Sequence, residues 1–319
     1  MKKISRCFLC QSTNFITLYT TSDRMFNLPG NFTYKKCVSC SLVFLDPQPN
    51  KDLLRRHYPT QGYFAYDKKG KGGLLGTIRE YIIKNTYSPT FLSRILAYLS
   101  NTNFAIPQYR KGGRILDLGC GTGDILILLK DLGLDVYGID IDKKAIQIGR
   151  KRGLKHLRIG TYKAINAYPN NYFDVIRLYH VIEHVSDPMA CLQILYKKLK
   201  SGGEVFLSTP NFDSPIRKIF GKYWSSLDAP RHLFIFTHQT LRKAVMQYKF
   251  KVHSMQYASA LGLVGSLQYL TNDLFKRRGN FFSNLFMAAA FFPTEWFLDK
   301  IGMGDSFVMQ LSKNDPQVT

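Results

Sequence analysis

The chain has 319 residues, of which 45% are hydrophobic, and its 44 Lys and Arg against 22 Asp and Glu give a formal net charge of +22. This composition excludes an intrinsically disordered chain and indicates one substantial α/β core with a smaller module, because domains usually have about 100–200 residues. The charge favours an anionic partner, which leaves nucleic acid, an acidic lipid surface and phosphorylated substrates as alternatives, with simple solubility as the non-specific explanation.

The amino terminus lacks the apolar stretch of a secretory signal, so we expect a protein that stays in the reducing cytoplasm. Cysteines then occur in two C-x-x-C pairs, formed by Cys7 with Cys10 and by Cys37 with Cys40. Four thiolates in this pattern can close a tetrahedral Zn²⁺ site with no open position, which makes the ion structural. We therefore predict a zinc ribbon at 1–49, with a redox pair or incidental cysteines as the alternatives.

A helical linker or lid is expected at 50–112, with amphipathic helices over 74–85 and 90–99. An aromatic loop, Tyr58 to Tyr66, precedes these helices and is followed by a basic, glycine-rich linker. The tyrosines of this loop either cover a functional site or seal the junction between the ribbon and the core.

A strand-like run, Arg114–Leu118, ends in the alternating glycines Gly119, Gly121 and Gly123, and helix-like sequence follows. Alternating glycines let the backbone bend with positive φ and bring its N–H groups against a ligand. A second short strand ends in Asp140, whose carboxylate can hydrogen-bond both hydroxyls of a ribose. The pattern predicts a nucleoside cofactor at this turn, and a tight βα turn without a ligand is the alternative.

The spacing of the glycines is G-x-G-x-G, which differs from the dinucleotide fingerprint because Asp124 stands where its third glycine would be. The stretch from Asp117 to Gly123, with Asp140, resembles the cofactor loop of class I S-adenosylmethionine-dependent methyltransferases. The resemblance implies a Rossmann-like α/β sheet with helices on both faces, at 113–319. It implies that S-adenosylmethionine is bound by Asp117, Gly119, Gly121, Gly123, Asp140 and Tyr179.

The second cysteine pair is followed by an apolar strand and by an Asp-Pro-x-Pro turn that begins at Asp46. This combination is similar to the zinc module found ahead of many bacterial methyltransferases, including deoxysugar C-methyltransferases and others in surface-polysaccharide pathways. The resemblance implies a small-molecule or lipid-linked saccharide as the acceptor. Because known members methylate diverse substrates, it indicates the chemistry more than the acceptor.

Beyond the cofactor loop, Asp142 is expected to cap a helix over 143–152, and a strand is expected over 155–159. Members of the resembled family often place an acidic residue after that strand, near the adenine. Here the sequence is Gly160-Thr161-Tyr162, which departs from that pattern.

The strand predicted over 171–179 is followed by His180-Val-Ile-Glu183-His184 at its carboxyl end, where open α/β sheets bind their ligands. By resemblance to the sugar C-methyltransferases, Glu183 and His184 are site residues. A histidine titrates near neutrality and can take a proton from an attacking group, so His184 is the predicted base and His180 a further candidate. Packing at a helix start is the alternative for each histidine, and an inverted zinc-protease motif is disfavoured by the context.

The remaining elements continue the α/β alternation. We expect a helix over 188–200 that is stopped by Ser201-Gly-Gly203, and a strand over 204–209. A helix over 239–248 capped by Thr237, a strand over 250–255 and a last strand over 306–311 should follow.

A loop beside the fifth strand is rich in polar and aromatic groups, and similar D-x-P-R-H segments occur in the same zinc-module methyltransferases. The substrate candidates in this loop are Trp224, Asp228, Arg231 and His232. They would supply a stacking face, a base or acceptor, and an anion clamp. The alternative is that Asp228 and Arg231 pair internally and hold the loop.

An insertion at 257–303 separates the last two strands and contains two largely uncharged apolar stretches, 258–272 and 281–292, joined by the basic Lys276-Arg-Arg278. Each stretch is shorter than the roughly 20 apolar residues of a membrane-spanning helix. The alternatives are a helical hairpin that covers the core or forms a dimer contact, and helices at an anionic membrane surface on the inner face of the membrane.

Together these features predict a methyltransferase that uses S-adenosylmethionine, with structural Zn²⁺, to methylate oxygen or carbon of a small acceptor, such as a sugar or a lipid-linked glycan precursor. The alternative is a zinc-ribbon nucleic-acid-binding protein or an RNA methyltransferase. That alternative is disfavoured because no amino-methylation motif follows the fourth strand and basic residues do not alternate with aromatics along one stripe. A cofactor-binding protein without activity is disfavoured by the intact loop and the Glu-His pair.

Overall fold

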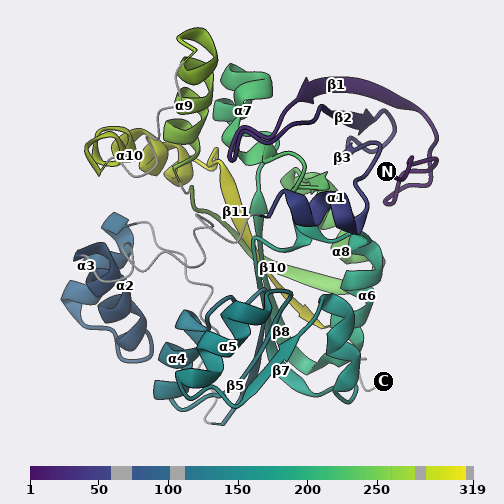
Figure 1. The fold of residues 1–319 in the computed structure, drawn as a ribbon. Coiled ribbons are helices and arrows are strands. Elements are labelled where there is room, and N and C mark those ends of the chain that lie inside the picture. The colour runs from purple at the N-terminus through teal and green to yellow at the C-terminus, as the bar shows by residue number, and fades with distance from the viewer. Residues whose placement is uncertain (59–73, 101–111, 260, 277–284, 314–319) are drawn as a thin grey trace.

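A computed structural model of the protein describes residues 1–58, 74–100, 112–259, 261–276 and 285–313 (Figure 1). The aromatic loop beyond Tyr58, the basic linker after it and Arg277-Arg278 lie outside the described residues.

The core is a seven-stranded sheet in the order β10-β11-β8-β7-β4-β5-β6. Its strands are β4 (Arg114–Leu118), β5 (Asp135–Asp140), β6 (His156–Ile159), β7 (Phe173–Tyr179), β8 (Leu199–Pro210), β10 (Phe250–Tyr257) and β11 (Ser306–Lys313). Five neighbouring strands are parallel, and β11 runs antiparallel to both β8 and β10. The chain order reverses at β4, so the carboxyl ends of β4, β5 and β7 border the crevice where such sheets bind ligands.

Helices cover both faces of this sheet, and the residues of β4 show why. Ile115 packs with helices α2 (Leu74–Lys84), α4 (Asp124–Asp131) and α5 (Lys143–Lys151), whereas Leu116 belongs to the core formed with α6 (Pro188–Lys198) and α8 (His238–Gln247). Successive strand residues point to opposite faces, so a strand buried on both faces is apolar at most of its positions. The predicted Rossmann-like sheet is confirmed.

The boundary between α6 and β8 differs from the prediction. The helix ends at Lys198 and the strand begins at Leu199, so the Ser201–Gly203 segment lies inside the strand and does not separate it from the helix. Leu199 is fully buried and pairs with Phe173 of β7. This long-range pairing begins the strand earlier than the local glycine signal indicates.

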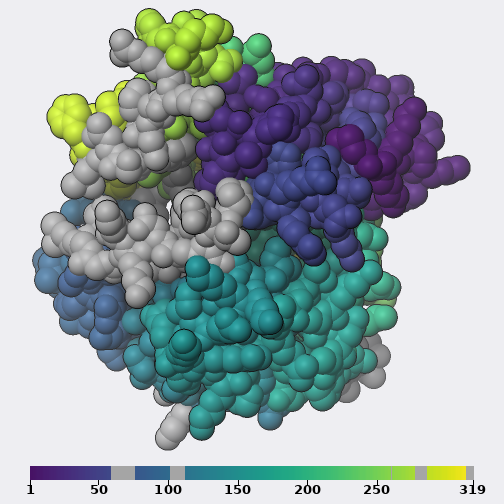
Figure 2. Space-filling view, viewed as in Figure 1, coloured from purple at the N-terminus to yellow at the C-terminus, as the bar shows by residue number. Residues whose placement is uncertain are grey.

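The amino-terminal ribbon contains the antiparallel strands β1 (Phe15–Thr21), β2 (Phe32–Cys37) and β3 (Val43–Leu45). A fourth strand, β9 (Phe234–Ile235), pairs with β3 and comes from the segment that follows the predicted substrate loop. In the space-filling view the purple ribbon packs directly on the rest of the molecule (Figure 2). The ribbon's sheet is therefore completed by residues that lie nearly 200 positions further along the chain.

Helix α1 (Lys51–Arg56) follows the ribbon, and α7 (Pro215–Phe220) follows β8. The helices expected over 74–85 and 90–99 are present as α2 and α3 (Phe91–Ser100). The insertion before the last strand contains α9 (Gly262–Leu274) and α10 (Leu285–Lys300), and α10 continues past the expected end of its apolar stretch. In the described part of the chain, no helix is long and apolar enough to span a membrane.

Candidate functional site

The turn after β4 has the backbone that its glycines predict, with φ of 77° at Gly119, 54° at Gly121 and 78° at Gly123. A Cβ at Gly119 would lie 2.5 Å from a methyl of Val181, and one at Gly123 would lie 2.2 Å from a methyl of Leu154. A Cβ at Gly121 would meet no atom of the described residues within 4 Å. The outer two glycines are therefore required by packing, whereas the middle one borders open space, as a loop that receives a nucleoside needs.

Asp140 ties this turn to the end of β5. One carboxylate oxygen accepts a hydrogen bond from the Gly121 N–H at 2.8 Å, and the other accepts from the Asp142 N–H at 2.8 Å. Burial raises the pKa of Asp140, and these backbone bonds act in the opposite direction. Each oxygen retains a second lone pair, so the carboxylate can still accept hydrogen bonds from a ribose.

Asp117 lies beneath the turn, 5% exposed, with an Arg177 guanidinium nitrogen 3.5 Å from its carboxylate. Burial raises the pKa of Asp117, and the charge of Arg177 opposes that rise. The side chain of Asp117 is therefore enclosed by the protein and pairs with Arg177. Tyr179, at the carboxyl end of β7, is 41% exposed.

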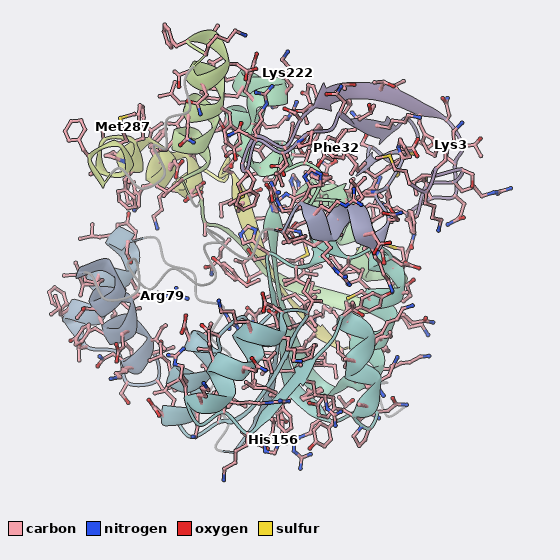
Figure 3. The ribbon with its side chains drawn as sticks, in the orientation of Figure 1. Lys3, Phe32, Arg79, His156, Lys222 and Met287 are labelled. Atoms are coloured by element: carbon pink, nitrogen blue, oxygen red, sulfur yellow. The ribbon has the colours of Figure 1, made fainter. Side chains whose placement is uncertain are left out.

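Arg79 of α2 is a residue that the sequence analysis missed. It lies on the side of α2 that faces the core (Figure 3), and burial lowers its pKa while the nearby carboxyls of Asp124 and Asp117 and the phenol of Tyr179 oppose this change. The guanidinium of Arg79 is thus close enough to the carboxyls of Asp117 and Asp124, which flank the glycine turn, to interact with them electrostatically. No motif surrounds Arg79 in the sequence, so only the packing of α2 on the core reveals it.

No acidic residue stands at the end of β6, as the sequence indicated. Thr161 instead caps the short 3₁₀ helix η2 (Tyr162–Ala167), and Tyr162 is buried. The adenine end of the expected cofactor site therefore has no carboxylate from this turn.

Glu183 and His184 lie in a 3₁₀ turn, η3 (Ile182–His184), directly after β7. The Glu183 carboxylate is fully buried and lies 3.0 Å from His180 Nδ1 and 3.1 Å from the hydroxyl of Thr209, which donates to it. Burial raises the pKa of Glu183, but the His180 contact and the neighbouring imidazoles outweigh it and lower the pKa to about 2. Glu183 is therefore an anion at neutral pH.

His184 is held through Nδ1, which lies 3.0 Å from the carbonyl oxygen of Arg231. Because a carbonyl can only accept, this bond requires the proton on Nδ1 and leaves the lone pair on Nε2. The Tyr58 hydroxyl lies 3.1 Å from the same Nδ1. Burial and the adjacent His232 lower the pKa of His184 to about 4, so the ring is neutral at neutral pH and Nε2 is free of a proton.

His232 joins these residues from the predicted substrate loop. Its ring centroid lies 4.6 Å from that of His184, and its Nδ1 lies 2.8 Å from the carbonyl oxygen of Ser226. One ring nitrogen of each histidine and a carboxylate oxygen of Glu183 all lie within 4.8 Å of one another. The structure thus brings together His180, Glu183, His184 and His232, which come from two segments of the chain.

The other substrate candidates are interior. Trp224 is 1% exposed, and its indole N–H donates to Asp305 at 2.7 Å. Arg231 is also 1% exposed and makes ion pairs with Asp228 and with Asp23 of the ribbon. A buried guanidinium is costly unless its donors are paired, so the loop uses these groups to hold itself. The geometry therefore matches the internal pairing of Asp228 and Arg231, and it leaves no exposed stacking face on Trp224.

The four cysteines of the ribbon converge as the spacing predicts. The sulfur atoms of Cys7 and Cys40 are 3.5 Å apart, as are those of Cys10 and Cys37, and all four sulfurs lie within 4.8 Å of one another. A tetrahedral zinc ion with Zn–S bonds of about 2.3 Å would need sulfurs about 3.8 Å apart. The donor set therefore fits a structural zinc ion.

The two cysteine knuckles also share one backbone conformation. The Gln11 N–H donates to the Cys7 carbonyl and the Ser41 N–H to the Cys37 carbonyl, both at 2.9 Å. Gln11 and Ser41 have positive φ, 62° and 67°. Two different sequences thus adopt the same turn. This turn lets both pairs of sulfur atoms face one point.

Comparison with known proteins agrees with this architecture. A family described as "Methyltransferase domain" matches residues 87–255. Since that range is more than half of the chain, the chain belongs to this family.

The curated relatives include ubiquinone biosynthesis O-methyltransferases. The enzyme of Xanthomonas oryzae pv. oryzae is 33% identical over 105 residues, which are 31% of this chain and 44% of the relative. The enzyme of Vibrio cholerae is 33% identical over 106 residues, which are 31% of this chain and 43% of the relative. The chain thus matches less than half the length of these relatives. The ribbon and the insertion at 257–303 lie outside the matched family domain.

Solved structures with a similar fold include S-adenosylmethionine-dependent methyltransferases. One from Archaeoglobus fulgidus is 20% identical, with a TM-score of 0.45, 74% of this chain and 96% of that chain covered. One from Mesorhizobium loti is 16% identical, with a TM-score of 0.45 and coverage of 65% and 94%.

Proposed function

We propose that this protein transfers the methyl group of S-adenosylmethionine to a hydroxyl or a carbon of a small acceptor, a sugar or a lipid-linked glycan precursor. The observation that carries this proposal is a juxtaposition at the carboxyl ends of β4, β5 and β7. There, the glycine turn with Asp140 lies on one side, and the buried Glu183 and the half-buried His184 lie on the other. Membership of the methyltransferase-domain family supports the same chemistry.

The cofactor residues have distinct tasks in this proposal. When bound, S-adenosylmethionine supplies an electrophilic methyl group on a sulfonium. Asp140 and the open side of Gly121 hold the nucleoside, and the cation of Arg79 holds the amino-acid carboxylate. Their common effect is alignment, since methyl transfer is an in-line displacement that depends on the position of the two reactants.

His184 is the proposed general base. As the acceptor oxygen bonds to the methyl carbon, its proton moves to Nε2, whose lone pair remains because Nδ1 faces a carbonyl. The Glu183 carboxylate, within 4.8 Å, favours the imidazolium that forms. The curated relatives are named O-methyltransferases, which favours a hydroxyl over a carbon, and the resemblance of the ribbon favours a sugar.

The test has two stages. Calorimetry with purified, zinc-loaded protein should detect binding of S-adenosylhomocysteine. Mass spectrometry should then find a methylated glycan or lipid in the host that disappears when the gene is deleted, returns with the wild-type gene and does not return with His184→Gln. Absence of cofactor binding would overturn the function, whereas full restoration by His184→Gln would remove only the base.

We also propose that an anionic membrane surface is a partner, through helices α3 and α10. Trp296 of α10 donates its indole N–H to the Tyr98 carbonyl of α3 at 3.1 Å, so the two helices form one wall. This wall carries exposed apolar side chains, including Phe91 (81% exposed) and Phe286 (78%). The Lys300 ammonium lies 4.3 Å from the Tyr98 ring. Aromatic side chains beside cations are typical of helices at membrane interfaces.

Vesicle flotation tests this partner. We expect the protein to float with vesicles that contain phosphatidylglycerol and not with pure phosphatidylcholine vesicles. The double variant Phe91→Ser, Phe286→Ser should stay at the bottom, whereas the control Ile219→Ser, which changes an equally exposed residue of α7, should float. Equal flotation of both variants would contradict the proposal.

A further inference from the structure

We propose that Asp23 of the zinc ribbon is a positioning residue for His184: acting through Arg231, it determines which ring nitrogen of His184 carries the proton. The proposal rests on the proposed function in one respect, namely that Nε2 of His184 takes the proton from the acceptor. It concerns a residue that lies 161 positions before His184 and has no contact with the glycine turn among the bonds described.

The first observation is that the guanidinium of Arg231 is fully hydrogen-bonded. Nε donates to the Asp228 carboxylate at 2.9 Å and Nη2 to the same group. Nη1 and Nη2 donate to the two oxygens of Asp23 at 2.9 and 3.0 Å, and Nη1 also donates to the His57 carbonyl at 2.9 Å. All five N–H donors of the fork thus have an acceptor, so the side chain is held in one position.

The second observation is the short connection from this side chain to the histidine. The carbonyl that accepts from His184 Nδ1 belongs to Arg231 itself, and the Arg231 N–H donates to the Asp228 carbonyl at 2.8 Å. Two residues further on, the Leu233 N–H donates to the Glu183 carbonyl at 2.8 Å. Because the guanidinium of Arg231 is fixed, the backbone carbonyl of the same residue is also fixed in its position against His184.

The third observation is that Asp23 is itself fixed by the ribbon side of the interface. Its side chain is buried, one oxygen accepts from the Phe26 N–H at 3.1 Å, and the other lies 2.7 Å from Nδ1 of His57. Phe26 also places its ring 4.8 Å from the guanidinium carbon of Arg231. Removing the Asp23 charge would leave two buried donors of Arg231 without a carboxylate, and the loop would have to move to satisfy them.

The fourth observation identifies what competes for His184. The Tyr58 hydroxyl lies 3.1 Å from the same Nδ1. A carbonyl can only accept, which requires the proton on Nδ1, whereas a phenol can donate and so favours the tautomer with the proton on Nε2. If the Arg231 carbonyl withdraws, the Tyr58 O–H can donate to Nδ1, and the lone pair at Nε2 is lost. Among the described residues, the other ionisable side chains near His184 are Glu183, His232 and Asp228.

The test is the tautomer of His184, read from its two imidazole nitrogens by long-range ¹H–¹⁵N NMR and assigned with His184→Gln. In the wild type we expect a protonated Nδ1 and an unprotonated Nε2 at neutral pH. In Asp23→Asn we expect the proton to shift toward Nε2 and the methylated host product to fall at least about tenfold. Affinity for S-adenosylhomocysteine should stay within about twofold. Adding Tyr58→Phe to Asp23→Asn should reduce the shift toward Nε2, because the competing donor is then absent.

A matched control separates positioning from stability. Asp46 is another buried carboxylate of the ribbon that pairs with Lys35 and makes no hydrogen bond or ion pair with Arg231 among the described residues. Asp46→Asn should therefore destabilise the ribbon without changing the His184 tautomer. If Asp23→Asn does not fold, Arg231→Lys, which keeps the charge but not the fork, should show the same shift. An unchanged tautomer in the folded Asp23 or Arg231 variant, or an equal change in Asp46→Asn, would overturn the proposal. If instead the proposed function is wrong, the wild-type protein will show the Nδ1–H tautomer of His184 but the host will contain no methylated product.

Discussion

At the scale of single residues, the glycines of the turn after β4 illustrate two different constraints. All three have positive φ, but only Gly119 and Gly123 face protein atoms that a Cβ would strike. Gly121 combines the same positive φ with space that no described residue occupies. A substitution at Gly121 should therefore affect a ligand more than the fold, and one at Gly123 the reverse.

We predict that Gly121→Ala costs about 1–2 kcal/mol of stability, from positive φ alone. It should weaken binding of S-adenosylhomocysteine by at least about tenfold, because the new methyl group occupies the open side of the turn. Gly123→Ala should cost about 1–3 kcal/mol more stability than Gly121→Ala, since Leu154 must also move. Urea denaturation and calorimetry measure the two effects. Wild-type affinity in Gly121→Ala would show that the cofactor does not approach this turn.

At the scale of elements, helix α9 begins without a capping side chain of its own. Its N-cap residue is Leu261, in the left-handed conformation, and the carboxylate of Glu295 on α10 instead accepts from the N–H groups of Leu261 and Leu263 at 3.0 and 2.7 Å. Burial raises the pKa of Glu295 to about 7, with the nearby Asp305 and Asp299 acting in the same direction. One buried carboxyl therefore joins the two helices of the insertion and titrates near neutrality.

We predict that the protein loses stability as the pH rises from about 5 to 8. The pKa of Glu295 is higher in the folded protein than in the unfolded chain, so at intermediate pH the folded protein keeps a proton that the unfolded chain has released. The stability that this proton contributes is complete below the unfolded pKa. It is lost as the pH rises through about 7. The loss should be about 1–3 kcal/mol. Glu295→Gln should flatten this dependence in melting curves, although Asp305, whose pKa burial raises to about 6, should leave part of it. An unchanged slope in Glu295→Gln would contradict the assignment.

At the scale of the whole molecule, the ribbon and the core are held together by several kinds of contact. Strand β3 pairs with β9, and the buried hydroxyl of Tyr34 on β2 lies within 2.8 Å of the carbonyls of Leu227 and His232. Asp23 binds Arg231. These contacts all reach the loop that contains Arg231, whose carbonyl faces His184, or the strand that follows it, so the cysteine-containing ribbon supports the geometry of the candidate site.

We predict one zinc ion per chain and a loss of several kcal/mol of stability when it is removed, a fall in melting temperature of about 10 °C. Cys37→Ser should lose the metal and broaden the His184 resonance, because the ribbon no longer holds Asp23 in place. The control Cys191→Ser, which changes a buried thiol outside the cluster, should keep its zinc. Metal analysis by mass spectrometry and thermal melts provide the measurements, and a metal-free wild type of equal stability would refute the structural role.

Local sequence determined much of this protein. The strand Arg114–Leu118, the positive φ of the three glycines after it, the strand that ends at Asp140 and the convergence of the four cysteines all follow from short-range patterns. These features depend on backbone conformation and on residues a few positions apart, which hydrophobic alternation and glycine spacing report directly.

Only the tertiary structure decided which groups meet across long distances in the chain. Arg79, Asp23 and His57 carry no motif. The bonds of Arg231 with Asp23 and His57, and the pairing of β3 with β9, join segments separated by more than 170 residues. A buried charge must find its counter-charge wherever the packed chain brings one, and a short edge strand pairs with whichever backbone is adjacent. Neither requirement leaves a local pattern in the sequence.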